Sequence, residues 1–260
     1  MAEPSTGCRV VAVGASNLTL GLSRVVDTAR RLLGDPVEIL AAHGPGRSYG
    51  TPTSVLGRRL PSIKDCGLWA ALEEADERPT YALMTDIGND ILYEVPVEVI
   101  LDWVRACLER LRATGAHTIL TLPPVGSVEG LSPSRYRLLR TLLFPRHRVP
   151  YGVALERTAQ TTEALKELAN EFGARVAELP ASWYGFDPIH IRRRFRSEAW
   201  SDVLSRWPVE AAAVEPVGPT LRRQLYLVTR RPLEWALFGY GCGRSQPAAS
   251  LPGGGSLALY

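Results

Sequence analysis

The feature that most constrains the fold of this chain is a repeated alternation between short apolar runs and longer amphipathic segments. The apolar runs are continuous, which is typical of parallel strands buried on both faces, and they span residues 9–14, 37–44, 80–88, 117–126 and 174–180. Between them lie segments 18–34, 66–77, 96–115 and 152–173. The last two segments carry apolar residues at spacings of three and four, which indicates amphipathic helices. Repeated strand–helix–strand units predict an α/β fold with a doubly wound parallel sheet.

Composition limits the classes of function. The chain has 260 residues, 45% hydrophobic and 22% charged, which suits one large domain or one domain with an appendage. A formal net charge of +3 is too small to indicate a nucleic-acid or membrane partner. No apolar run could span a bilayer and the first residues do not resemble a secretory signal, so we expect a cytoplasmic protein. The four cysteines and four histidines show no metal-ligand spacing.

The composition changes after Trp207. The sequence EAAAVEPVGPT, residues 210–220, is typical of a linker, so we expect a main domain over residues 1–208 and a C-terminal extension over residues 209–260. Within the extension, the segments SQPAASL and SLALY are separated by PGGG and are expected to form a hairpin packed on the main domain. A cover over the mouth of the active site, or a subunit contact, is the alternative role. The sequence does not indicate an oligomeric state.

A serine directly follows the first predicted strand. In VVAVGASNL, residues 10–18, the apolar run ends at Gly14, and Ser16 stands where a helix begins. Ligands of doubly wound sheets bind beyond the carboxyl ends of the strands, so Ser16 lies where a nucleophile is expected. Unpaired N–H groups and the helix dipole would also favour negative charge there. The alternative is that Ser16 or Asn17 only caps the helix.

The ends of the second and third predicted strands suit the binding of an anion. The second ends in AAHGPGRSYG, whose glycines let the backbone approach a ligand closely, although a plain turn explains them equally well. Neither G-x-x-x-x-G-K-[ST] nor G-x-G-x-x-G occurs there or after the first strand. The third ends in TDIGNDILY, where the amide of Asn89 could donate to an oxyanion. Capping of the next helix by Asn89 or Asp90 is the competing interpretation.

A carboxylate and an imidazole follow the fifth predicted strand. In SWYGFDPIHIRRR, Asp187 and His190 are three residues apart, so a single turn can bring the carboxylate beside the ring Nδ1. The Nε2 atom would then be free to take a proton from a serine. Asp187 followed by Pro188 also fits the start of a helix, but that interpretation leaves His190 unexplained. His147 is the reserve candidate for the base.

These segments together resemble the four blocks of the SGNH hydrolases, also called the GDSL esterase and lipase family. The blocks read GASNL with Ser16, GPGRSYG with Gly46, GND with Asn89, and DPIH with Asp187 and His190. They occur in the family's order and after the corresponding strands, and the resemblance covers residues 9–207. The proline pair in TLPPVG is also similar to many members.

The resemblance implies a fold, a mechanism and roles for residues. The fold would be a three-layer α/β/α, flavodoxin-like sandwich around a five-stranded parallel sheet. Ser16 would attack a small ester, with His190 as general base and then acid, oriented by Asp187. The oxyanion would be held by the N–H groups of Ser16 and Gly46 and by the amide of Asn89. No metal or organic cofactor is expected, and the substrate would be a short-acyl or acetyl ester.

The sequence departs from the family pattern in three ways. Ala15 stands where the first block usually has aspartate, so a supporting hydrogen bond would be lost. Gly44 could replace Gly46 if the turn is offset, and the last fifty residues have no counterpart. Two other functions stay open: acyl transfer, in which an alcohol intercepts the same acyl-enzyme, and a binding module that keeps the fold without turnover.

Overall fold

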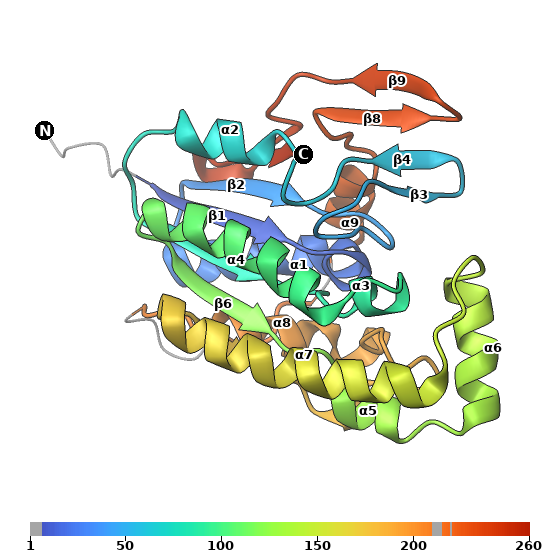
Figure 1. Cartoon of the computed structure of the whole chain (residues 1–260). Coiled ribbons are helices and arrows are strands. Elements are labelled where there is room, and N and C mark those ends of the chain that lie inside the picture. Colours follow the sequence, from blue (N-terminus) through green and yellow to red (C-terminus); the bar gives the residue numbers. More distant parts are fainter. Residues whose placement is uncertain (1–6, 210–214, 219) are drawn as a thin grey trace, which may run out of the picture.

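The five predicted strands form one parallel sheet in the computed structural model, which describes residues 7–209, 215–218 and 220–260 (Figure 1). Neighbouring strands pair in parallel register throughout this set. Their order across the sheet is β2 (Val37–Ala42), β1 (Cys8–Val13), β5 (Thr80–Met84), β6 (His117–Thr121) and β7 (Arg175–Ala177). The prediction of an α/β fold with a parallel sheet is therefore confirmed.

The prediction that this sheet has only five strands is wrong. Beyond β2, the sheet continues with β11 (Ser256–Leu259), which pairs in parallel with β2, and with β10 (Ala249–Ser250), which pairs antiparallel with β11. A strand at the edge of a sheet presents a row of unpaired N–H and C=O groups. The C-terminal segment satisfies that row on β2 and makes a sheet of seven strands.

Helices cover both faces of this sheet (Figure 1). Successive strand residues point to opposite faces, so Val11 and Val13 of β1 enter one buried cluster while Val10 and Ala12 enter the other. The first cluster contains residues of α2 (Leu68–Glu73), α4 (Val97–Ala113) and α7 (Tyr151–Phe172). The second contains residues of α1 (Ser16–Leu33), α8 (Arg196–Leu204) and α9 (Leu221–Val228). Three layers result, with the sheet in the middle.

The strand order places a crevice beside β1. The chain runs from β1 to β2 on one side and then returns to add β5 on the other side of β1. In doubly wound sheets the ligand site lies beyond the carboxyl ends of the strands, at the point where the order reverses. Here that point lies between the loops that follow β1 and β5.

A second, smaller sheet joins segments from both sides of the expected boundary at residues 208 and 209. It is antiparallel and contains β3 (Thr53–Val55), β4 (Arg58–Leu60), β8 (Glu234–Leu237) and β9 (Tyr240–Gly243). The extension therefore contacts the main domain through both sheets and through α9, which packs against α1. Of the expected linker, residues 210–214 and 219 lie outside the described residues.

Three short helices complete the carboxyl side of the sheet: α3 (Asn89–Leu92), α5 (Val125–Glu129) and α6 (Pro133–Leu143). Among the described residues, no helix is both long and apolar enough to cross a membrane.

Candidate active site

Ser16, His190 and Asp187 form a continuous chain of hydrogen bonds at the carboxyl edge of the sheet. The Ser16 Oγ atom lies 2.8 Å from His190 Nε2, and His190 Nδ1 lies 2.5 Å from Asp187 Oδ2. With Asp187 as an acceptor, Nδ1 carries the proton and Nε2 is left to accept from the serine. The structure thus brings Ser16 into contact with His190, which lies 174 positions later in the sequence, and keeps Asp187 beside the His190 ring.

The Asp187 carboxylate organises its own loop. Its Oδ1 atom accepts hydrogen bonds from the N–H groups of Ile189 (3.0 Å) and His190 (3.3 Å), which fold the segment into a tight turn without a helix. The interpretation of Asp187 as the cap of a helix is therefore wrong. Burial opposes ionisation of Asp187, but the His190 ring and these two N–H groups outweigh it and hold the pKa of Asp187 below its ordinary value.

The helix that begins at Ser16 is capped by a carboxylate from the loop after β5. Asp86 Oδ2 accepts from the N–H groups of Ala15 (2.8 Å), Asn17 (3.1 Å) and Leu18 (3.2 Å). The side chains of Ser16 and Asn17 make no capping bond on α1, so the interpretation of either one as a simple cap is wrong. Within the described part of the chain, the Ser16 N–H has no hydrogen-bond partner.

The amide of Asn89 is buried and has an unused donor. Asn89 is 8% exposed, and its Nδ2 atom has no hydrogen-bond partner among the described residues. No side chain caps α3, and Asp90 instead accepts from the Tyr49 N–H at 3.0 Å. Neither Asn89 nor Asp90 is therefore present as a helix cap. A buried donor without an acceptor is costly for a protein, so it usually has a functional reason.

Gly46 lies in a turn that only glycine can make without strain. Its φ is +62°, and a Cβ atom there would lie 2.7 Å from the hydroxyl of Tyr93. That hydroxyl donates to the Gly46 carbonyl at 2.5 Å. In residues 7–209 and the described parts beyond them, this N–H has no partner. The carbonyl of Gly44, the alternative glycine, accepts from the Arg47 N–H at 3.1 Å.

The reserve candidate His147 and the nearby His43 contact residues other than Ser16. The ring of His147 packs against Tyr93, with centroids 5.2 Å apart. His43 is half-buried, and its Nδ1 lies 2.9 Å from Thr19 Oγ1. Burial of the ring, together with the neighbouring positive charges of Arg47 and Arg58, lowers the pKa of His43 to about 3. His190 is thus the histidine whose ring contacts Ser16.

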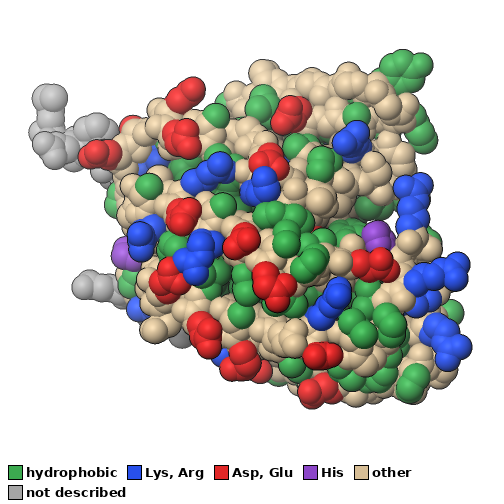
Figure 2. Space-filling model, viewed as in Figure 1, with side chains coloured by type: hydrophobic (Ala, Val, Ile, Leu, Met, Phe, Trp, Pro, Cys, Tyr) green, Lys and Arg blue, Asp and Glu red, His purple; other side chains and the backbone are tan. Residues whose placement is uncertain are grey.

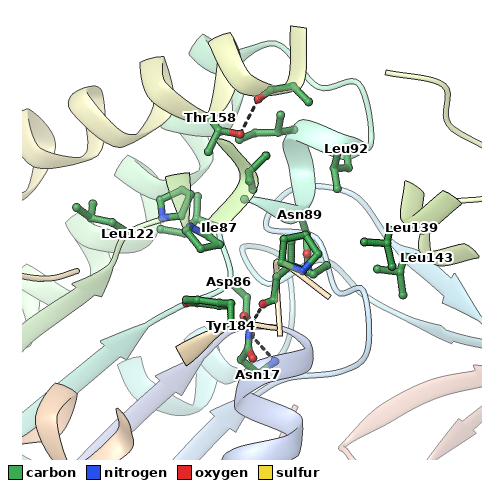
Figure 3. Close-up of a pocket in the computed structure, with 18 of the residues that line it drawn as sticks. Asn17, Asp86, Ile87, Asn89, Leu92, Leu122, Leu139, Leu143, Thr158 and Tyr184 are labelled. Carbon is green, nitrogen blue, oxygen red and sulfur yellow. Dashed lines mark hydrogen bonds between the residues drawn. The ribbon is translucent and has the colours of Figure 1, made fainter. Parts of the chain in front are cut away.

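An apolar pocket opens beside Asn89 (Figure 3). Asn17, Asp86 and Asn89 lie at its polar end. The rest of its wall comes from α3, α5, α6 and α7 and from the segments that follow β5, β6 and β7. Most of these side chains are aliphatic or aromatic, among them Ile87, Leu92, Leu122, Leu139, Leu143 and Tyr184. A pocket of this kind suits an apolar group attached to a polar, reacting centre.

The surface near α6 is both basic and apolar. In Figure 2, basic side chains gather at the right-hand edge of the view, where Figure 1 places α6 and its neighbouring loops. Leu138 and Leu142 of α6 are 60% and 73% exposed there. The basic runs near residues 146–148 and 192–194 make no ion pair within the described residues. Residues 146, 148, 193 and 194 of these runs are exposed to solvent.

Two polar residues at the site escaped the sequence reasoning. Asp86 lies two residues after β5, so its position at a strand end is the only sign of it in the sequence. The sequence gives Asn17 no role other than that of a cap. Among the described residues, no group of three or more His, Cys, Asp or Glu side chains could hold a metal ion.

Comparisons with known proteins support the fold. No family model matches the chain, and no curated protein matches it either. One crystal structure superimposes with a TM-score of 0.52 at 16% identity, over 77% of this chain and 97% of its own. The psychrotrophic esterase EstA from Pseudoalteromonas sp. gives a TM-score of 0.47 at 13% identity, over 76% of this chain and 97% of its own.

A structure of TesA gives a TM-score of 0.44 at 18% identity, over 76% of this chain and 96% of its own. A mutant of the esterase AlinE4 gives 0.43 at 17% identity, over 88% of this chain and 93% of its own. At these identities the likeness concerns the fold. Two of these structures, EstA and AlinE4, are named as esterases in their descriptions.

Proposed function

We propose that this protein is a serine esterase that hydrolyses a small carboxylic ester through an acyl-enzyme. The observation that carries the proposal is the chain of hydrogen bonds from Ser16 Oγ through the His190 ring to Asp187. A serine hydroxyl is a weak nucleophile unless a positioned base takes its proton during attack. Here the base is in contact with the hydroxyl, and a carboxylate fixes the tautomer of the base.

In the first half of the reaction, Ser16 Oγ attacks the ester carbonyl carbon while His190 Nε2 takes the hydroxyl proton. The carbonyl oxygen becomes an oxyanion, which needs donors that are already oriented. The N–H groups of Ser16 and Gly46 and the Nδ2 of Asn89, which have no partner among the described residues, would supply them. His190 then gives its proton to the departing alcohol, and the ester bond breaks to leave an acyl-serine.

In the second half, water replaces the alcohol. His190 takes a proton from the water, the hydroxyl attacks the acyl carbon, and the same donors hold the second oxyanion. The tetrahedral species collapses to release the carboxylic acid, and His190 returns its proton to Ser16. Asp187 stays ionised throughout, and its depressed pKa supports that role.

The pocket beside Asn89 supports an apolar acyl group on the substrate. Its polar end contains Asn89, and its wall contains side chains from four helices. We therefore expect short linear acyl chains to react, with the chain directed toward Leu92 and Leu143 (Figure 3). The four cysteines are unpaired, which supports a protein of the reducing cytoplasm.

A fluorophosphonate probe tests the proposal. We expect the folded wild-type protein to be labelled covalently on Ser16, and Ser16→Ala to lose the label while it unfolds at the same temperature. Absence of labelling in folded wild-type protein would instead support a binding module. Turnover of p-nitrophenyl esters of increasing acyl length, with and without glycerol, then defines the acyl preference and separates hydrolysis from acyl transfer.

A further inference from the structure

The side chain of Asn17 connects three separate parts of the site. Its Nδ2 atom donates to Asp86 Oδ1 and to the Ile189 carbonyl, both at 2.8 Å. Its Oδ1 atom accepts from the Ile191 N–H at 3.0 Å. The two main-chain partners are the residues on either side of His190. Asn17 therefore holds the backbone that carries His190 against the helix that carries Ser16.

Asp86 determines which way the Asn17 amide is oriented. A carboxylate only accepts hydrogen bonds, so the amide must turn its NH₂ group toward Asp86. In that orientation Nδ2 also reaches the Ile189 carbonyl, and Oδ1 faces the Ile191 N–H. The opposite orientation would bring oxygen against oxygen at Asp86 and Ile189, and N–H against N–H at Ile191. One of the two amide rotamers is therefore excluded.

The conformation of Asp86 is unusual for a residue with a side chain. Its φ is +62°, in the left-handed region, where residues other than glycine are strained. Three N–H groups of the α1 N-terminus and the Asn17 amide all donate to its carboxylate. The main-chain donors come from the residues on either side of Ser16, and the Ser16 N–H itself does not donate to Asp86. Asp86 thus occupies the N-terminus of α1 and leaves the donor on Ser16 free.

We infer that Asn17 and Asp86 are a pair of positioning residues that set the distance between His190 and Ser16. The inference rests on the proposed function, because it assigns the pair a role in the transfer of the serine proton. Neither side chain hydrogen bonds to the reacting atoms. Their effect passes through the main chain at Ile189 and Ile191 and through the first turn of α1.

The test compares kcat and KM in variants that lose these contacts. Asn17→Ala should lower kcat by about 30- to 100-fold and change KM less than threefold, because misplacing a reacting group by about 1 Å can cost about 100-fold in rate. The matched control is Thr19→Val, which loses the Thr19 bonds to Ala15 and His43 in the same turn of α1. It should keep kcat within threefold of the wild type. The melting temperatures of both variants are measured in parallel.

The second arm tests whether the two residues act as a pair. Asp86→Asn should lower kcat in the wild-type background, since an amide no longer dictates the Asn17 orientation. In the Asn17→Ala background it should change kcat less than threefold. Asp86→Asn also provides the test if Asn17→Ala does not fold.

Two results would overturn the inference: a kcat for folded Asn17→Ala within threefold of the wild type, or an equal loss in Thr19→Val. Failure of the proposed function looks different, because the wild type itself would then resist the fluorophosphonate probe.

Discussion

The two sides of the candidate active site differ in how completely their polar atoms are paired. On the base side, both ring nitrogens of His190, both oxygens of Asp187 and all donors and acceptors of the Asn17 amide have partners. On the anion side, the N–H groups of Ser16 and Gly46 and the Nδ2 of Asn89 have none within the described residues.

This difference is what a nucleophilic site requires. A base must be held in one tautomer and at one distance, so its neighbours are saturated with hydrogen bonds. Donors for an oxyanion must instead be oriented and vacant until the charge develops on the substrate. Polar groups that have hydrogen-bond partners stabilise the fold, whereas buried donors without partners destabilise it. Mutations on the two sides should therefore affect activity and stability in different proportions.

The largest effect is expected from Asp187→Asn on the base side. The amide can present a donor to His190 Nδ1 and favour the wrong tautomer, so kcat should fall by roughly 10³- to 10⁴-fold. The control is Asp35→Asn, a carboxylate held by Arg30 at the other end of α1, which should leave kcat unchanged. Steady-state kinetics on both variants measure the effect. A fall in kcat of less than tenfold for Asp187→Asn would remove Asp187 from the mechanism.

On the anion side, Asn89→Ala should lower kcat by about 10²- to 10³-fold. Its melting temperature should stay the same or rise, because the variant deletes a buried donor that has no partner. Asn170→Ala, at an exposed position on α7, is the control and should change neither quantity. If Asn89→Ala lost stability as well as activity, the amide would have a structural role. The base side and the anion side would then not differ in how mutations affect stability.

The smallest effect on activity is expected from Asp90→Asn. This variant should instead change how the stability of the protein depends on pH. Burial raises the pKa of Asp90 to about 6, although Ser48 and the Tyr49 N–H oppose the shift. The folded state therefore binds this proton more tightly than the unfolded state does. Stability from this group is present in acid and is lost as the pH rises through about 6.

Asp90→Asn should remove that loss. Between pH 4 and pH 8, the free energy of unfolding of the variant should rise relative to that of the wild type by on the order of 2–3 kcal/mol. Its kcat should stay within about threefold of the wild type. Urea unfolding at several pH values measures the difference. Asp102→Asn, at an exposed position on α4, should keep the wild-type dependence on pH. If the free energy of unfolding changed with pH in the same way for Asp90→Asn and the wild type, the expected protonation of Asp90 would be contradicted.

Much of the fold follows from local patterns in the sequence. The continuous apolar runs predicted β1, β2, β5, β6 and β7, and the spacing of apolar residues predicted α4 and α7. These patterns are readable because each element buries a face of its own. The candidate site followed in part for the same reason, since strand ends meet at one edge and Ser16, Asn89 and His190 all follow strands.

The remainder depends on contacts between distant segments. The sequence of β11, SLAL, does not indicate that this strand pairs with β2. The strands β3 and β4 have three residues each, which is too short for a periodic pattern. The capping of α1 was also unpredictable, because its carboxylate comes from Asp86 and not from the helix's own first residues. Pairing partners, unlike periodicity, are properties of the assembled sheet.

The pairing of β11 with β2 also bears on the order in which the molecule assembles. Leu257 pairs with Ile39, and the buried guanidinium of Arg47, next to Gly46, donates to the main-chain oxygen of Tyr260 and to the carbonyl of Pro61. Contacts between such remote parts of a chain form late and slowly during folding. The glycine turn consequently gains one of its anchors only after residues 256–260 have docked. A folding intermediate in which residues 256–260 have not yet docked would lack the hydrogen bond from Arg47 to Tyr260. Recovery of enzymatic turnover after dilution from denaturant should therefore lag behind recovery of helical circular dichroism.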